Sequence, residues 1–373
     1  MSKPGGRVSI LAVPLAITLA TCLFLTTGCG KPESNNHADS MTLERKVGQL
    51  LLVGFEGTSM TPELENLLNT VHPGGVILFG RNVTGADQLK SLVRSLQATS
   101  LEDSGQPLFV AIDQEGGQVR RLAWLDDALA QADITGSEQA YELALRRAEA
   151  LSQLGINLNL APVLDLAGPG DFLYKYGRIL PGDAQNVGVL GLNLIRGQKD
   201  GGIFSAAKHF PGYGGINYDP ETTIIPVMPG LPETSQFQTA LQARPEFVMT
   251  ANVIYQSVDP NLPFSLSPAG IGFLRGNLAG DYLIITDDLA SKALKDTYTL
   301  PAAAVLASQA GADILLISSN QSGEVVAAYD RLLEAARSAE LSQSTIDDAV
   351  SRIVSLKGRL AQPQLPDAAR KGE

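Results

Sequence analysis

The stretch AAKHFPGYGGINYDPETT, residues 206–223, places polar side chains directly after a short apolar run. Lys208 and His209 put one cation and one neutral donor side by side, a combination suited to holding sugar hydroxyls. A lone histidine is usually a structural residue, so the pair matters more than His209 by itself. Asp219 and Glu221 add two carboxylates to the following loop. The stretch indicates either a catalytic loop or a catalytic loop that has lost its chemistry.

Two other apolar runs also end in charged residues. In AIDQEGGQVRRL, Asp113 ends the run and Arg121 follows eight residues later, which fits either a binding pair or a turn with a solvated salt bridge. In IITDDLASKAL, Asp287 and Asp288 are adjacent, and both are typical helix-capping residues. Alternatively, Asp287 does chemistry while Asp288 caps the helix or orients its neighbour. The residues alone leave these alternatives open.

The elements that must position these residues alternate regularly from about Met41 onward. Short aliphatic runs indicate buried parallel strands, and amphipathic stretches between them indicate helices. The runs cover residues 50–55, 75–80, 108–113, 156–166, 204–210, 247–255, 282–288 and 313–319. Eight such units predict an α/β fold, a single-domain (β/α)8 TIM-type barrel whose active site lies at the carboxyl ends of the strands. A doubly wound open sheet is the alternative, but no glycine-rich nucleotide loop follows the first run.

The N-terminus predicts export. A short basic stretch precedes an uncharged apolar run over residues 8–28, which is typical of a secretory signal. The run ends in LTTGCG, which resembles a bacterial lipoprotein processing site, so we expect a signal peptide over 1–28 and lipidation of Cys29. A plain transmembrane anchor is the alternative. We expect a flexible tether over 29–41, the barrel over 42–360 and a disordered tail over 361–373, in a lipoprotein of the cell membrane or envelope.

Composition limits the partners. The chain has 44% hydrophobic residues and a net charge of −11, so we expect a globular protein that does not bind nucleic acid. Its two cysteines are Cys22 and Cys29, which excludes disulfides and thiolate metal sites from the barrel. We expect no metal and no organic cofactor, and we expect a monomer.

Seven blocks occur in the same order as in glycoside hydrolase family 3, and the chain resembles most its single-domain β-N-acetylglucosaminidases, bacterial enzymes that trim peptidoglycan fragments. The blocks are KVGQLLLVGFEGT, GGVILFGRNV, IDQEGGQVRRL, LGINLNLAPVLDL, KHFPGYG, MTANVIY and IITDDLASKAL. The resemblance implies a retaining mechanism, in which an aspartate at the position of Asp287 attacks the anomeric carbon and a separate general acid protonates the leaving oxygen. It also implies a set of residues that bind the sugar in the −1 subsite: Asp113, Arg121, Arg178, Lys208 and His209.

The catalytic loop departs from the family pattern. The subfamily carries K-H-F-P-G-H-G, four residues and then D-S-H, whose last histidine is the acid/base. Here Asp219 keeps the aspartate position, Glu221 stands at the histidine position and Tyr213 replaces the histidine of G-H-G. Asn252 replaces a further histidine, in the block MTANVIY.

Three interpretations follow from this departure. In the first, Glu221 is the acid/base, and burial or a neighbouring carboxylate such as Asp219 raises its pKa. In the second, the barrel binds cell-wall sugar with impaired catalysis. In the third, the enzyme acts on another β-glycoside. We favour a hydrolase that releases terminal β-linked N-acetylglucosamine from peptidoglycan fragments. Asp287 is then the expected nucleophile, and Asp219 the residue that supports Glu221.

Overall fold

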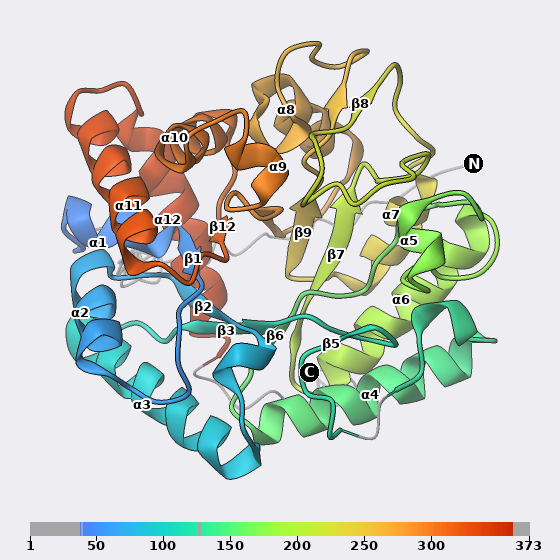
Figure 1. The fold of residues 1–373 in the computed structure, drawn as a ribbon, viewed down its shortest axis with the longest axis horizontal. Helices are drawn as coiled ribbons and strands as arrows, with labels where there is room; N and C mark the ends of the chain where they lie inside the picture. The colour runs from blue at the N-terminus through green and yellow to red at the C-terminus, as the bar shows by residue number, and fades with distance from the viewer. Residues whose placement is uncertain (1–37, 39, 126–127, 361–373) are drawn as a thin grey trace, which may run out of the picture. The chain divides into compact units, whose positions relative to one another are not determined.

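The computed structural model describes residues 38, 40–125 and 128–360. Its central feature is a sheet of eight parallel strands, hydrogen-bonded in chain order (Figure 1). The strands are β1 (Leu51–Val53), β2 (Gly75–Leu78), β3 (Phe109–Ile112), β6 (Leu158–Asn159), β7 (Phe204–Phe210), β9 (Phe247–Thr250), β11 (Leu283–Thr286) and β12 (Leu315–Ile317). β12 pairs with β1, and a parallel bridge between Ile285 and Ile314 brings β11 to β12. The sheet therefore closes into the predicted barrel.

Helices surround these strands, as Figure 1 shows. The longer ones are α1 (Leu43–Gln49), α2 (Pro62–Val71), α3 (Ala86–Ser104), α4 (Ser137–Gln153), α6 (Ala184–Asp200), α7 (Ser235–Ala240), α8 (Pro268–Asn277), α10 (Leu300–Ala310), α11 (Ser322–Arg337) and α12 (Gln343–Gly358). Local sequence explains their ends. The Thr61 hydroxyl caps the start of α2, where Pro62 takes the first helical position, and Gly311 ends α10 in the left-handed conformation.

Two predicted strands are clearly shorter than their apolar runs: residues 247–255 supply only Phe247–Thr250 to the barrel, as β9, and residues 156–166 are shortened further. Of residues 156–166, only Leu158 and Asn159 belong to the regular ladder, as β6. Pro162 has no N–H to donate, which interrupts the ladder. The chain nevertheless continues beside β7, because Leu164 N donates to Lys208 O and Lys208 N donates to Pro162 O. This extension carries Asp165 to the same end of the barrel as the other candidate residues.

The two ends of the barrel differ in chemistry. The first residues of β3, β7 and β9 are Phe109, Phe204 and Phe247, all fully buried. The Phe109 ring contacts the other two edge-on, with centroids 5.2 Å from Phe247 and 6.3 Å from Phe204. Aromatic side chains thus pack at the amino end of the barrel, and the candidate site residues gather at the carboxyl end.

Several predictions concern residues that the structure does not describe. The signal peptide, Cys29, most of the tether and the tail over 361–373 lie outside the described residues and stay predictions. Across residues 38, 40–125 and 128–360, the helices are too short or too polar to span a bilayer.

Candidate active site

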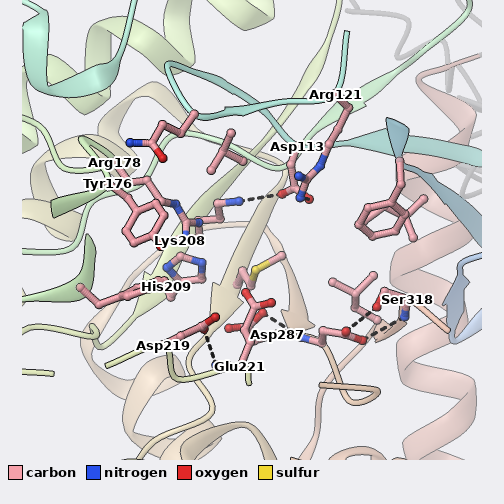
Figure 2. A pocket seen from close by; sticks show the side chains of 18 residues that line it. Asp113, Arg121, Tyr176, Arg178, Lys208, His209, Asp219, Glu221, Asp287 and Ser318 are labelled. Carbon is pink, nitrogen blue, oxygen red and sulfur yellow. Dashed lines mark hydrogen bonds and ion pairs between the residues drawn. The ribbon is translucent and has the colours of Figure 1, made fainter. Parts of the chain in front are cut away.

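A pocket opens at the carboxyl ends of the strands, and every side chain that the sequence nominated for catalysis or sugar binding lines it. Figure 2 shows Asp219, Glu221 and Asp287 together on one side of this pocket, with Asp113 and Arg121 opposite them. The nominated residues come from loops or strand ends far apart in the chain. The barrel therefore brings together the whole candidate set: Asp113, Arg121, Arg178, Lys208, His209, Asp219, Glu221 and Asp287.

Lys208, on β7, is held by two carboxylates. Its Nζ lies 2.8 Å from Asp113 Oδ1 and 2.7 Å from Glu115 Oε1. Burial alone would lower the pKa of Lys208, but the charges of Asp113 and Glu115 outweigh it and raise that pKa. Arg121 NH2 lies 3.3 Å from Asp113 Oδ2, so Asp113 is shared between two cations. Lys208 therefore remains a cation that can donate to a sugar hydroxyl.

Glu115 is a functional-site residue that the sequence reasoning missed. It lies on β4 (Gln114–Gly116), which forms a hairpin with β5 (Val119–Arg120). Its carboxylate accepts two hydrogen bonds from Arg178, from Nε at 2.9 Å and from NH2 at 2.8 Å. Burial would raise the pKa of Glu115, but Arg178 and Lys208 hold it well below its usual range. Glu115 thus orients Arg178; its position two residues after Asp113 was the available signal.

Asp165 is the second residue that sequence reasoning missed. Its fully buried carboxylate accepts hydrogen bonds from His209 N and His209 Nδ1, each at 2.9 Å to Oδ2. Its Oδ1 accepts the Tyr213 N–H at 2.5 Å. Because an ionised carboxylate only accepts, His209 carries its proton on Nδ1, which leaves Nε2 for the pocket. A carboxylate at the end of an apolar run, in LAPVLDL, was the signal.

Asp287 follows β11 directly and is 5% exposed. Tyr213 donates its hydroxyl to Asp287 Oδ2 at 2.5 Å, and the Asp288 N–H donates to Oδ1 at 2.8 Å. Asp288 accepts from the N–H groups of Ala290 and Ser318 and from the Ser318 hydroxyl. Burial raises the pKa of Asp288 to about 6 despite these bonds. Asp288 thus ties its own turn to the loop after β12, and Asp287 faces the pocket.

Glu221 lies on the long loop after β7. Its backbone carbonyl accepts the Ala293 N–H at 2.8 Å, which ties the loop to the short helix α9 (Lys292–Lys295). Burial in the pocket, followed by the charge of Asp287, raises the pKa of Glu221 to about 8, against the opposing charge of Arg178. Glu221 still exposes surface at the pocket mouth, where solvent screens these charges. The upward direction of this pKa shift, more than its size, indicates that Glu221 can act as a proton donor.

Asp219 has a different place from the one we expected. Its Oδ1 accepts the Glu221 N–H at 3.0 Å, and its Oδ2 accepts the Thr222 hydroxyl at 2.7 Å. It therefore closes the turn that presents Glu221. The carboxylate charge that acts most strongly on the pKa of Glu221 belongs to Asp287 rather than to Asp219. Asp219 supports Glu221 through the backbone.

The described part of the chain holds no group of three or more histidine, cysteine or acidic side chains arranged to bind a metal ion.

A closed parallel barrel with carboxylates and cations at its carboxyl end has the architecture of a TIM-barrel enzyme. Residues 42–356 match the glycosyl hydrolase family 3 N-terminal domain. The chain belongs to glycosyl hydrolase family 3, as its sequence blocks predicted.

Known proteins of similar sequence or structure agree with this assignment. A beta-hexosaminidase of Alkalilimnicola ehrlichii is 32% identical over 297 residues, covering 72% of this chain and 80% of that protein. An "uncharacterized secreted glycosyl hydrolase" of Arthroderma benhamiae is 29% identical over 337 residues, covering 87% and 96%. The solved structure of a family 3 β-N-acetylglucosaminidase from a Paenibacillus species superposes with a TM-score of 0.79 at 35% identity, covering 86% of this chain and 63% of that chain.

Proposed function

We propose that the protein is a retaining glycoside hydrolase that releases terminal β-linked N-acetylglucosamine, with Asp287 as nucleophile and Glu221 as acid/base. Family membership and the similar β-hexosaminidases support the reaction class. One observation carries the assignment of roles: the two carboxylates share a pocket but have opposite environments. Asp287 accepts two hydrogen bonds that stabilise its charge, whereas burial and neighbouring charge raise the pKa of Glu221 to about 8.

The reaction then takes two steps. An Asp287 oxygen bonds to the anomeric carbon as the bond to the leaving oxygen breaks, and the Glu221 proton goes to that leaving oxygen. In the second step Glu221, now ionised, takes a proton from water. The water oxygen bonds to the anomeric carbon, and the electron pair of the ester bond returns to Asp287.

The opposite side of the pocket would hold the sugar. Lys208 and Arg178 are cations with fixed directions, because Asp113 and Glu115 position them. His209 offers Nε2, since Asp165 occupies its other ring nitrogen. Two fixed cationic donors and one fixed acceptor nitrogen suit the hydroxyl and acetamido groups of a sugar, because little side-chain freedom is lost on binding.

The location and natural substrate are further proposals. We infer export, supported by the signal-like N-terminus and by the secreted relative, and a lipid anchor at Cys29. Peptidoglycan fragments are the inferred source of the sugar, and a monomer the inferred state. Replacing Cys29 by serine would move the protein from the membrane fraction to the soluble fraction; unchanged fractionation would reject the anchor.

The test is hydrolysis of an aryl N-acetyl-β-D-glucosaminide by the protein without residues 1–29, with NMR of the first sugar released. We expect turnover and β-N-acetylglucosamine as the first product. Release of the α-anomer would contradict the retaining mechanism. No turnover but measurable sugar binding would identify an impaired, sugar-binding barrel. The absence of both turnover and binding would indicate that the substrate is another β-glycoside.

A further inference from the structure

Tyr213, which stands where the family carries a histidine, contacts the proposed nucleophile directly. It is 3% exposed, and its hydroxyl lies 2.5 Å from Asp287 Oδ2. The Asn252 N–H donates to the same hydroxyl oxygen at 2.8 Å. Because a carboxylate is an acceptor only, the hydroxyl hydrogen must point at Asp287. The direction of this hydrogen bond is therefore determined by its neighbours.

The phenol is held from several sides. Its ring packs edge-on against the His209 ring, with centroids 5.0 Å apart, and its N–H binds Asp165. Asn252, which orients the hydroxyl, is itself held by the Ser265 hydroxyl and by the Asp288 carbonyl. A side chain fixed on this many sides pays little entropy when it donates.

The donor also keeps its proton. Burial, together with the negative charge of Asp287, raises the pKa of Tyr213 well above its ordinary value. Tyr213 is consequently a neutral hydrogen-bond donor throughout the pH range in which a glycosidase works.

The bond matters differently in the two halves of the reaction. A hydrogen bond to an ionised group is stronger than one to a neutral group. Asp287 attacks as a carboxylate in the proposed mechanism and becomes a neutral ester once the sugar is attached. Tyr213 therefore stabilises Asp287 most when the carboxylate is released, which is the second step.

We propose that Tyr213 is a positioning residue that aligns Asp287 and promotes its release from the glycosyl-enzyme. The proposal rests on the function proposed above. As water bonds to the anomeric carbon, the ester bond breaks, its electron pair returns to Asp287, and the Tyr213 hydroxyl stabilises the charge that forms there. Proton transfer stays with Glu221, and the phenol keeps its own proton.

The test is Tyr213→Phe with an activated aryl N-acetyl-β-glucosaminide. We expect kcat to fall about tenfold, because the difference between the charged and neutral hydrogen bonds is lost from the second step. We expect kcat/KM to fall less than about threefold, so KM also decreases. A burst of aryl alcohol should appear, and intact-protein mass spectrometry should find the glycosyl-enzyme. Equal losses in kcat and kcat/KM without accumulation, or unchanged kinetics, would overturn the proposal.

Tyr255→Phe is the matched control. The Tyr255 hydroxyl is buried and donates to Gly212 O at 2.5 Å on the same loop, but it does not contact Asp287. We expect no accumulation of glycosyl-enzyme in this variant. Accumulation there equal to that in Tyr213→Phe would show that any disturbance of the loop has this effect and would reject a specific role for Tyr213.

A second variant tests the proposal even if Tyr213→Phe fails to fold. Replacement of Tyr213 by 3-fluorotyrosine keeps the ring and strengthens the donor, so the glycosyl-enzyme should accumulate less than in the native protein or not at all. Increased accumulation would overturn the proposal. Failure of the proposed function is a separate result, since the native protein itself would then show no turnover.

Discussion

Removal of the Glu221 proton donor gives the sharpest test of the altered catalytic loop. Its raised pKa, about 8, keeps the carboxyl mostly protonated near neutral pH and lets it ionise in more basic solution. The acid is competent below this pKa. For the native protein, kcat/KM should therefore fall about tenfold per pH unit above pH 8 when the leaving group is poor.

Glu221→Gln removes the proton and keeps the size of the side chain. Loss of a general acid costs about 10²- to 10⁴-fold in rate, or about 3–5 kcal/mol. We expect that loss in kcat/KM for alkyl or sugar leaving groups, and little loss for an activated aryl leaving group that departs without a proton. The fall in kcat/KM above pH 8 should be absent from this variant, because the carboxyl that titrates there has been removed.

The assay is a series of N-acetyl-β-glucosaminides with leaving groups of graded acidity, measured from pH 5 to pH 10. Glu233→Gln serves as the control, because Glu233 lies in the same segment between β7 and α7 but outside the lining of this pocket. An equal loss for every leaving group, or a fall in kcat/KM above pH 8 that persists in Glu221→Gln, would refute the role of Glu221.

Two further predictions concern stability. Glu115→Ala leaves Arg178 buried without its bidentate partner. This should destabilise the fold by about 3–5 kcal/mol and lower the melting temperature by several degrees. A melting temperature within one degree of the native value would contradict this prediction. Lys357 is buried over the Phe109 ring, and burial lowers its pKa to about 7. Between pH 7 and the ordinary pKa of lysine, Lys357 is protonated in the unfolded chain but neutral in the folded chain. The free energy of unfolding therefore falls as the pH falls from that ordinary pKa to pH 7. Lys357→Met should therefore gain about 3 kcal/mol relative to the native protein on going from pH 9 to pH 6. A gain independent of pH would contradict this.

Most of the fold was predictable because each strand is a short apolar run followed by a helix with its own start and stop signals. The runs 247–255 and 156–166 were exceptions, and the second of them suggested one long strand. Pro162 divides it, because a residue without an N–H cannot continue the ladder. The extension past Pro162 follows from pairing with Lys208, a contact that local sequence does not encode.

Most residues of the candidate site were predictable from the sequence, but the hydrogen bonds and ion pairs between them were not. Asp113, Lys208 and Asp287 stand at strand ends, where a barrel places its chemistry. Glu115 and Asp165 were missed because their partners lie 63 and 44 residues away. Tyr213 was recognisable as a replaced histidine, yet its contact with Asp287, 74 residues on, depends on how neighbouring strands of the barrel end together.

The most direct test of the central claim is the turnover of an aryl N-acetyl-β-glucosaminide by Asp287→Asn beside the native protein, with N-acetylglucosamine binding measured on both. The substitution keeps the shape and removes the nucleophile. We expect turnover by the native protein, loss of at least about 10³-fold in kcat for the variant, and binding in both. Unchanged turnover in Asp287→Asn would exclude Asp287 as the nucleophile and contradict the mechanism.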